Sequence, residues 1–321
     1  MARGAQPAGA VGLRGHRALS ADVRVEVVVL TCGRPAELAR TLDRLDALPE
    51  RPRIVVVDNA SRGSRTERVA RSFAQVEYVR CRRDRGAAGR NDGVARVRAP
   101  YVAFCDDDTF WAPGAIRRAA DLLDAHPTIG AVGARVLVGV SERVDPTCDG
   151  MARSPLRVPG APGPALISFL AGAVVCRVDA YRAAGGYEPR LFLGAEEALL
   201  GLELATRGWR MVYAADVVAH HHPASTSRAR RQRAVAGLRN RVWIAWLRLP
   251  AAGAVYESRR ALRDAAERGV RGEVLRAALR GVPWLLSARR VVPEAVYAQW
   301  CQVHGGPSRP AAEAPAPASA T

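Results

Sequence analysis

Short apolar runs and amphipathic segments alternate along the first half of the chain. Val23–Leu30 is rich in β-branched residues, which is typical of a buried parallel strand. Pro35 suits the first turn of a helix, and four leucines then give that helix one apolar face (Leu38, Leu42, Leu45 and Leu48). Further strands are expected at Ile54–Val57, Val76–Val79 and Tyr101–Cys105. This order predicts an α/β fold with a parallel sheet flanked by helices.

The second half has a less regular pattern. Strands are expected at Ile129–Val138, Leu166–Cys176 and Met211–Ala214, and a helix at Glu196–Arg207. We therefore expect four parts: a disordered segment (1–22), an α/β domain (23–223), a basic helical extension (224–304) and a disordered Pro/Ala tail (305–321).

The extension begins with a basic amphipathic segment, Arg228–Leu249. Apolar residues recur at helical spacing (Val235, Leu238, Val242, Trp246 and Leu249), and seven arginines surround them. Such a helix can lie on an anionic membrane surface, or it can pack on the α/β domain with its arginines in solvent. The sequence leaves both interpretations open, and the same two interpretations apply to a second expected helix, Gly272–Leu279.

Three polar clusters follow expected strands, at Cys32–Gly33, Asp58–Asn59 and Asp106–Asp108. Ligands of parallel sheets bind at the carboxyl ends of the strands, so these clusters should meet at one edge. Three adjacent carboxylates repel one another unless a cation offsets their charge, although such a triplet also caps helices. The position of Asp106–Asp108 at a strand end favours the cation site.

Other segments have a structural and a functional interpretation. Asp58 can bind a nucleoside or close an Asx-turn, and the glycine-rich Arg85–Gly93 can attract phosphate to a helix start. Glu196 and Glu197 can complement a helix dipole or supply a general base. His220–His222 can complete a metal shell or form a surface turn before Pro223.

The charge and the cysteines of the chain indicate its binding partners and its cellular compartment. The formal net charge is +17 without a single lysine, which favours anionic partners such as nucleotides or phospholipids. Nucleic acid is not expected, because aromatic residues do not interleave with the basic runs. Six cysteines without a CxxC pair indicate a reduced, cytoplasmic protein. No signal peptide is expected, and the longest apolar run, Ala165–Cys176, is too short to span a bilayer.

Taken in order, these motifs resemble glycosyltransferase family 2. The resemblance covers residues 23–223 and rests on VVVLTCGRP (Val27–Pro35), IVVVDNAS (Ile54–Ser61), RGAAGRNDG (Arg85–Gly93), the strand with the aspartates (Tyr101–Ile116) and the segment Phe169–Pro223. It implies a GT-A fold, which is a Rossmann-like mixed sheet flanked by helices, here with a helical C-terminal extension. It also implies inverting sugar transfer from a nucleotide-sugar. From the cysteines and the basic segment, we expect this reaction in the cytoplasm or at the inner face of the membrane.

The resemblance also implies residue roles. Thr31, Arg34, Asp58, Arg90, Asn91, Asp106 and Asp107 would contact the nucleotide-sugar. Asp108, with His220 or His221, would hold Mn²⁺ or Mg²⁺, and Glu197, with Glu196 beside it, would be the catalytic base.

Two departures from the family pattern leave questions open. The usual ED-x-D-L reads Glu196-Glu197-Ala198-Leu199-Leu200, so either glutamate can act. The QxxRW motif of processive synthases is missing, which favours transfer of one sugar to an acceptor hydroxyl on a glycan, a lipid-linked molecule or a small molecule. A nucleotidyltransferase and a non-catalytic nucleotide-sugar-binding or membrane-binding module remain as alternatives.

Overall fold

The computed structural model describes residues 24–223 and 228–307, and its strands form one sheet of ten. The order is β3-β2-β1-β4-β9-β6-β10-β5, with β7 paired to β6 and β8 to β10. The first four strands are parallel, as predicted (β1 Val25–Thr31, β2 Ile54–Asp58, β3 Val76–Arg80 and β4 Tyr101–Asp106). The other pairs are mostly antiparallel, which makes the sheet mixed and confirms the expected fold class.

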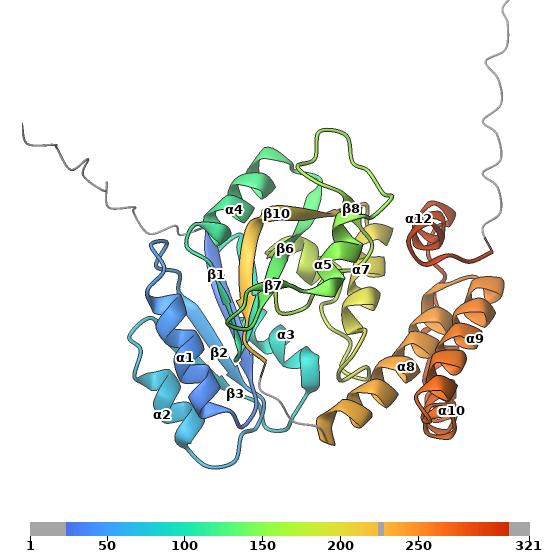
Figure 1. Cartoon of the computed structure of the whole chain (residues 1–321), viewed down its shortest axis with the longest axis horizontal. Helices are drawn as coiled ribbons and strands as arrows, with labels where there is room; N and C mark the ends of the chain where they lie inside the picture. The colour runs from blue at the N-terminus through green and yellow to red at the C-terminus, as the bar shows by residue number, and fades with distance from the viewer. Residues whose placement is uncertain (1–23, 224–227, 308–321) are drawn as a thin grey trace, which may run out of the picture.

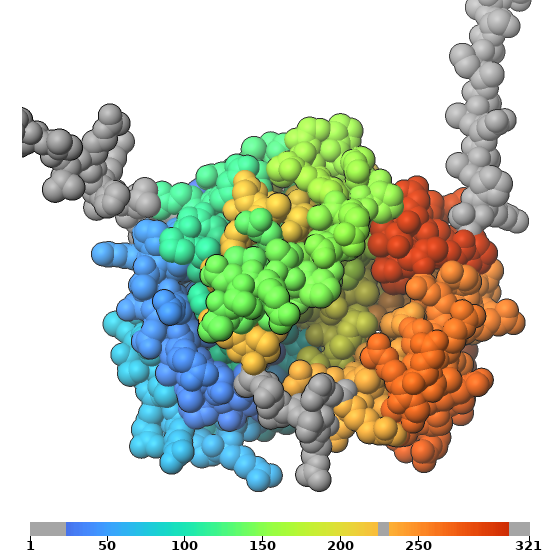
Figure 2. Space-filling view, in the orientation of Figure 1, coloured from blue at the N-terminus to red at the C-terminus, as the bar shows by residue number. Residues whose placement is uncertain are grey.

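Helices cover this sheet because each presents an apolar face to it. In α1 (Pro35–Asp46) the predicted leucines Leu38, Leu42 and Leu45 are completely buried. Figure 1 and Figure 2 show α1 and α2 (Arg65–Arg71) at one side of the molecule and the C-terminal helices at the other. The other helices of this part are η1 (Gly86–Ala88), α3 (Gly89–Val94), α4 (Ala115–Ala125), α5 (Pro146–Ala152) and α6 (Val178–Ala183).

The prediction of one strand over Leu166–Cys176 is wrong. The structure has β8 (Ala165–Leu166) and β9 (Val174–Arg177), with no strand between them. Leu166 pairs with β10, whereas Val174 pairs with β6 (Ile129–Val138), so the chain must cross between two places in the sheet. An apolar run alone does not reveal such a crossing.

The expected short strand Met211–Ala214 is part of a longer one, β10 (Arg210–His221). Its pairing with β6 shifts register between Ala214 and Val218, as in a β-bulge. Beyond the shift, β10 pairs with β5 (Thr109–Trp111) and carries His220 and His221 into the sheet. The remaining strand, β7, spans Arg143–Val144.

The C-terminal helices share a core with the sheet domain. Ile167 and, in α7 (Glu196–Thr206), Leu199 and Leu202 pack in one cluster with Trp243, Ile244 and Leu247 of α8 (Arg228–Arg248). In α8, Leu238 and Val242 are buried, as is Leu249 just beyond it, whereas Trp246 is partly exposed. Its apolar stripe therefore packs on the protein. The helices that follow are α9 (Ala251–Glu267), α10 (Arg271–Leu279), α11 (Val282–Ala288) and α12 (Glu294–His304).

Three further findings concern membrane-spanning helices, the cysteines and the ends of the chain. Among the described residues, no helix is both long enough and apolar enough to cross a bilayer. All six cysteines are free. The segment 1–22 and most of the tail 305–321, both expected to be disordered, lie outside the described residues.

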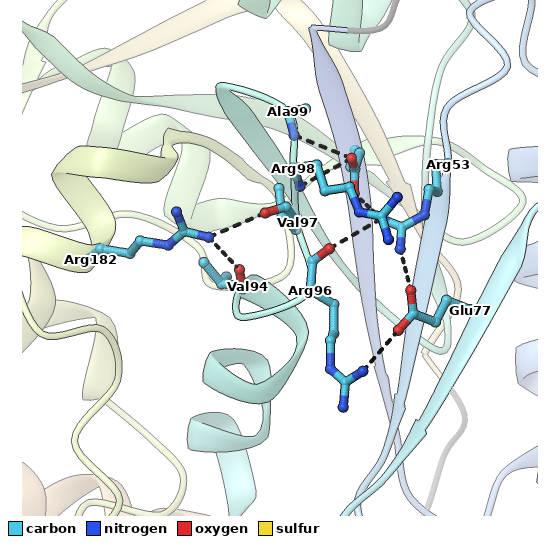
Figure 3. Close-up of polar contacts among 9 residues, drawn as sticks. Arg53, Glu77, Val94, Arg96, Val97, Arg98, Ala99 and Arg182 are labelled. Atoms are coloured by element: carbon cyan, nitrogen blue, oxygen red, sulfur yellow. Dashed lines mark hydrogen bonds and ion pairs between the residues drawn. The ribbon is translucent and has the colours of Figure 1, made fainter.

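A network of charged side chains closes the amino end of the parallel strands (Figure 3). Arg53 forms ion pairs with Glu26 of β1 and Glu77 of β3. The other carboxylate oxygen of Glu26 accepts hydrogen bonds of 3.2 Å from the backbone amides of Arg98 and Ala99. The buried Glu26 carboxylate is thus fully partnered by Arg53 and by the two amides before β4, so the network fixes where β4 enters the sheet.

Candidate active site

Asp107 connects the carboxyl ends of β1 and β4. Its side chain accepts hydrogen bonds from the Thr31 hydroxyl at 2.8 Å and pairs with the Arg34 guanidinium at 2.7 Å. Burial raises the pKa of Asp107 to about 7, and Arg34 opposes this shift. Thr31 and Asp107 are almost completely buried, so in this structure they hold the strand ends together.

Asp108 lies between a guanidinium and an imidazole. Arg34 donates to its Oδ2 at 2.8 Å, and Nε2 of His221 lies 3.6 Å from its Oδ1. Its backbone carbonyl accepts a hydrogen bond from the amide of His222, which ties the turn to β10. Asp108 and His221 are thus brought together as the sequence predicts for metal ligands.

His220 points elsewhere, because successive side chains of a strand alternate between faces. Its ring stacks on Phe110 with centroids 5.1 Å apart, and its Nδ1 lies 3.4 Å from Glu142. The described part of the chain contains no cluster of three or more His, Cys, Asp or Glu side chains able to hold a metal ion. A cation at Asp108 and His221 would therefore need further oxygens from its substrate or from water, as is usual for diphosphate-bound Mg²⁺.

Asp58 is completely buried at the end of β2. One carboxylate oxygen accepts a hydrogen bond from the Ser61 amide at 2.8 Å, and the other accepts one from the Tyr78 hydroxyl at 2.6 Å. The local turn that the sequence allowed is therefore present. A contact between Asp58 and a nucleoside stays a prediction.

Arg90 and Asn91 lie on α3, after the glycine-rich turn. Arg90 is buried, forms an ion pair with Asp106 and lies 5.5 Å from the centre of the Tyr187 ring. Asn91 donates to the carbonyl of Tyr187 and accepts from the Tyr181 hydroxyl and the Tyr187 amide. In this structure Asn91 fixes the turn before the glutamates, while Arg90 balances the charge of Asp106.

Glu196 and Glu197 begin α7 after a loop with an unusual backbone. Phe192, Gly194 and Ala195 all have positive φ angles, which orients the first turn of α7. Glu196 is buried, and its Oε2 has no hydrogen-bond partner among the described residues. Burial and the neighbouring Glu196 raise the pKa of the half-buried Glu197 to about 8, and burial also raises the pKa of Glu196.

One cavity of about 330 Å³ brings the strand end and the glutamates together. Asp106, His221, Glu196 and Glu197 line it, and Arg233 of α8 adds a guanidinium. A second cavity of about 420 Å³ shares Glu197 and extends to His304 at the end of α12. The C-terminal extension thus contributes side chains to both cavities.

Asn240 of α8 holds the loop before the glutamates, a contact that the sequence analysis missed. This completely buried amide donates to the carbonyls of Leu191, Leu193 and Gly194 at 2.6–3.2 Å. On its other side the loop is held by the Ala87 amide, which donates to the Phe192 carbonyl at 2.7 Å. The available signal was one uncharged asparagine in an arginine-rich helix, on the same side as Trp243, Ile244 and Leu247 and opposite the predicted apolar stripe.

The mixed sheet and the helices that flank it form a GT-A fold, and solved glycosyltransferase structures with this fold are similar. A mannosyltransferase from Pyrobaculum calidifontis in complex with GDP-Man and Mn²⁺ has a TM-score of 0.52 and 18% identity, over 87% of this chain and 85% of that one. S. aureus TarS 1–349 in complex with UDP-GlcNAc has a TM-score of 0.56 and 15% identity, over 86% and 83%. Residues 26–181 match the family model described as Glycosyl transferase family 2. A search of curated proteins finds no match.

Proposed function

We propose that this glycosyltransferase moves one sugar from a nucleotide-sugar to an acceptor hydroxyl, with inversion at the anomeric carbon and with a divalent cation. The observation that carries the proposal is the shared cavity, in which Glu197 faces the same space as Asp106 and His221. A base near the acceptor and an acidic strand end near the donor are the two parts that a direct displacement requires.

Glu197 is the proposed base and Glu196 its neighbour. Glu197 accepts the proton of the acceptor hydroxyl while that oxygen attacks the anomeric carbon and the bond to the nucleoside diphosphate breaks. The raised pKa of Glu197 suits this role, because a carboxylate that holds protons more tightly is a stronger base. Arg233 lines the cavity, and Arg90 pairs with Asp106 at its edge, so both guanidinium groups can offset negative charge on the donor side.

Mn²⁺ or Mg²⁺ would be held by Asp108 and His221. The carboxylate and the imidazole fit such an ion, since Oδ1 of Asp108 faces His221 away from the ion pair with Arg34. When bound, the cation stabilises the charge of the leaving diphosphate. Arg34, Thr31, Asp58, Asn91, Asp106 and Asp107 remain the proposed surroundings of the nucleotide-sugar.

A thermal-shift screen of nucleotide-sugars tests the donor and the cation together. GDP-linked and UDP-linked sugars come first, because the similar structures bind GDP-Man and UDP-GlcNAc. A matching donor should raise the melting temperature with Mn²⁺, and should raise it less without Mn²⁺.

Product analysis then separates the alternatives. Sugar transfer releases a nucleoside diphosphate, a nucleotidyltransferase releases pyrophosphate, and a binding module releases neither. We place the reaction in the cytoplasm or at the inner face of a membrane.

A further inference from the structure

The outer face of α10 and α11 carries an exposed apolar stripe. Leu275, Leu279, Val282 and Leu286 recur at i, i+4, i+7 and i+11, which places them on one side of a helix. Arg280 and Gly281, between the two helices, keep backbone angles near those of a right-handed helix, so the stripe runs on from α10 into α11. Leu279 and Leu286 are the most exposed, at 67% and 76%.

The inner face of the same helices is firmly packed. Val274 is completely buried, Leu285 is nearly so, and the Trp243 indole donates to the carbonyl of Ala278 at 2.9 Å. Gly281 lies against the Trp243 ring, where a Cβ would come within 2.5 Å of ring carbon. The inner face of α10 and α11 is therefore well packed, and the stripe is a stable part of the protein surface.

The charge around the stripe is strongly positive. Residues 271–293 contain five arginines (Arg271, Arg276, Arg280, Arg289 and Arg290) and a single acid, Glu273, which pairs with Arg231. Within the described part of the chain, the guanidinium groups of Arg271, Arg280 and Arg290 have no ion-pair partner. Apolar side chains flanked by free guanidinium groups complement a surface that is apolar beneath a layer of anions.

We propose that α10 and α11, through the stripe and its arginines, bind the surface of an anionic phospholipid membrane. Contact between two copies of this face would bring ten arginines together, which electrostatic repulsion disfavours. A membrane accepts the leucines between its headgroups while its phosphates pair with the guanidinium groups. The binding is peripheral, and it does not depend on the proposed transfer reaction.

Sedimentation with vesicles tests the proposal on the full chain. The protein should bind phosphatidylcholine vesicles that contain phosphatidylglycerol, bind pure phosphatidylcholine vesicles far less, and dissociate at high salt. The double variant Leu279→Glu/Leu286→Glu should bind the anionic vesicles at least about tenfold more weakly. Arg276→Gln/Arg280→Gln should weaken binding by roughly tenfold or more, since each arginine near the surface contributes about 1 kcal/mol.

Val140→Glu is the matched control, because Val140 is an apolar residue 95% exposed on a distant turn, and its loss should leave vesicle binding unchanged. Both leucine positions are exposed, so their variants should keep the parental melting temperature. Unchanged vesicle binding by Leu279→Glu/Leu286→Glu would overturn the proposal. So would a parental dimer in light scattering that the same variant converts to monomer, because the stripe would then bind a second copy. Glu197→Gln should bind vesicles normally, which separates this test from that of the transfer reaction.

Discussion

Charged side chains gather at both ends of the parallel strands, and the two groups differ in how they are satisfied. At the amino end, Glu26 and Glu77 share Arg53, and Glu26 also accepts two backbone hydrogen bonds. At the carboxyl end, Glu196 keeps an oxygen that no other described residue hydrogen-bonds, and Glu197 has a strongly raised pKa. Buried charge that the chain satisfies by itself supports the fold, whereas buried charge left incomplete marks a place for a substrate.

Substitution of Glu197 should have the largest effect. Glu197→Gln keeps the shape and removes the proton acceptor, so turnover should fall by roughly two to four orders of magnitude while donor affinity stays nearly unchanged. Single-turnover kinetics at saturating donor measure this. Glu196→Gln is the matched control, because adjacent residues of a helix point about 100° apart and only one faces the acceptor. An inactive Glu196→Gln beside an active Glu197→Gln would reverse the assignment.

Asp108→Asn should cost roughly two to three orders of magnitude in turnover, because a neutral amide no longer offsets the charge of a cation on the leaving diphosphate. Isothermal titration calorimetry of a nucleoside diphosphate, with and without Mn²⁺, is the informative measurement. The Mn²⁺-dependent part of the affinity should disappear. If it persists, the cation is held by other residues.

Asn240→Asp should lower kcat by roughly 10- to 100-fold, since a carboxylate would face three carbonyl oxygens and displace the loop before Glu196. The Michaelis constant for the donor should change much less. Trp246→Phe is the control, because it removes one partly exposed hydrogen bond of the same helix, to Ser258. A lower melting temperature with an unchanged kcat would limit Asn240 to a structural role.

The pH dependence of turnover should follow the protonation of Glu196 and Glu197. Because its pKa is raised to about 8, Glu197 is protonated at neutral pH, and turnover should rise about tenfold per pH unit up to that value. The same shift lowers the stability of the folded protein as pH rises from the ordinary glutamate pKa of about 4.5 towards 8, so the melting temperature should fall across that range and level off above it. Glu197→Gln should lose both dependences, and a parental profile that is flat between pH 6 and 8 would contradict the assignment.

Arg53→Met should have the smallest effect on turnover. It leaves Glu26 and Glu77 without their shared partner, so we expect a loss of about 2–3 kcal/mol of stability. Urea denaturation measures the loss, and the rate per folded molecule should match the parent. A catalytic defect of the folded protein would show that the two ends of the sheet are coupled.

Local patterns allowed part of this architecture to be predicted. The strands β1 and β2 are rich in valine, and β4 is an apolar run that ends in aspartates, so a parallel sheet and the convergence of Asp58 and Asp106 on one edge followed from the sequence. The crossing between Leu166 and Val174 and the bulge in β10 depend on partners far along the chain. The same holds for the hydrogen bond from Tyr78 to Asp58 and for those of Asn240, since no short-range pattern encodes either contact.

The core shared by Ile167, Leu199 and Leu202 with Trp243 and Leu247 bears on how the molecule unfolds. Because these side chains come from both sides of the sequence boundary near residue 224, the sheet and the terminal helices should melt in a single cooperative transition. The helices are therefore not an exchangeable module. A chain that ended before them would expose half of a hydrophobic cluster and leave the Leu191 and Gly194 carbonyls without their donor.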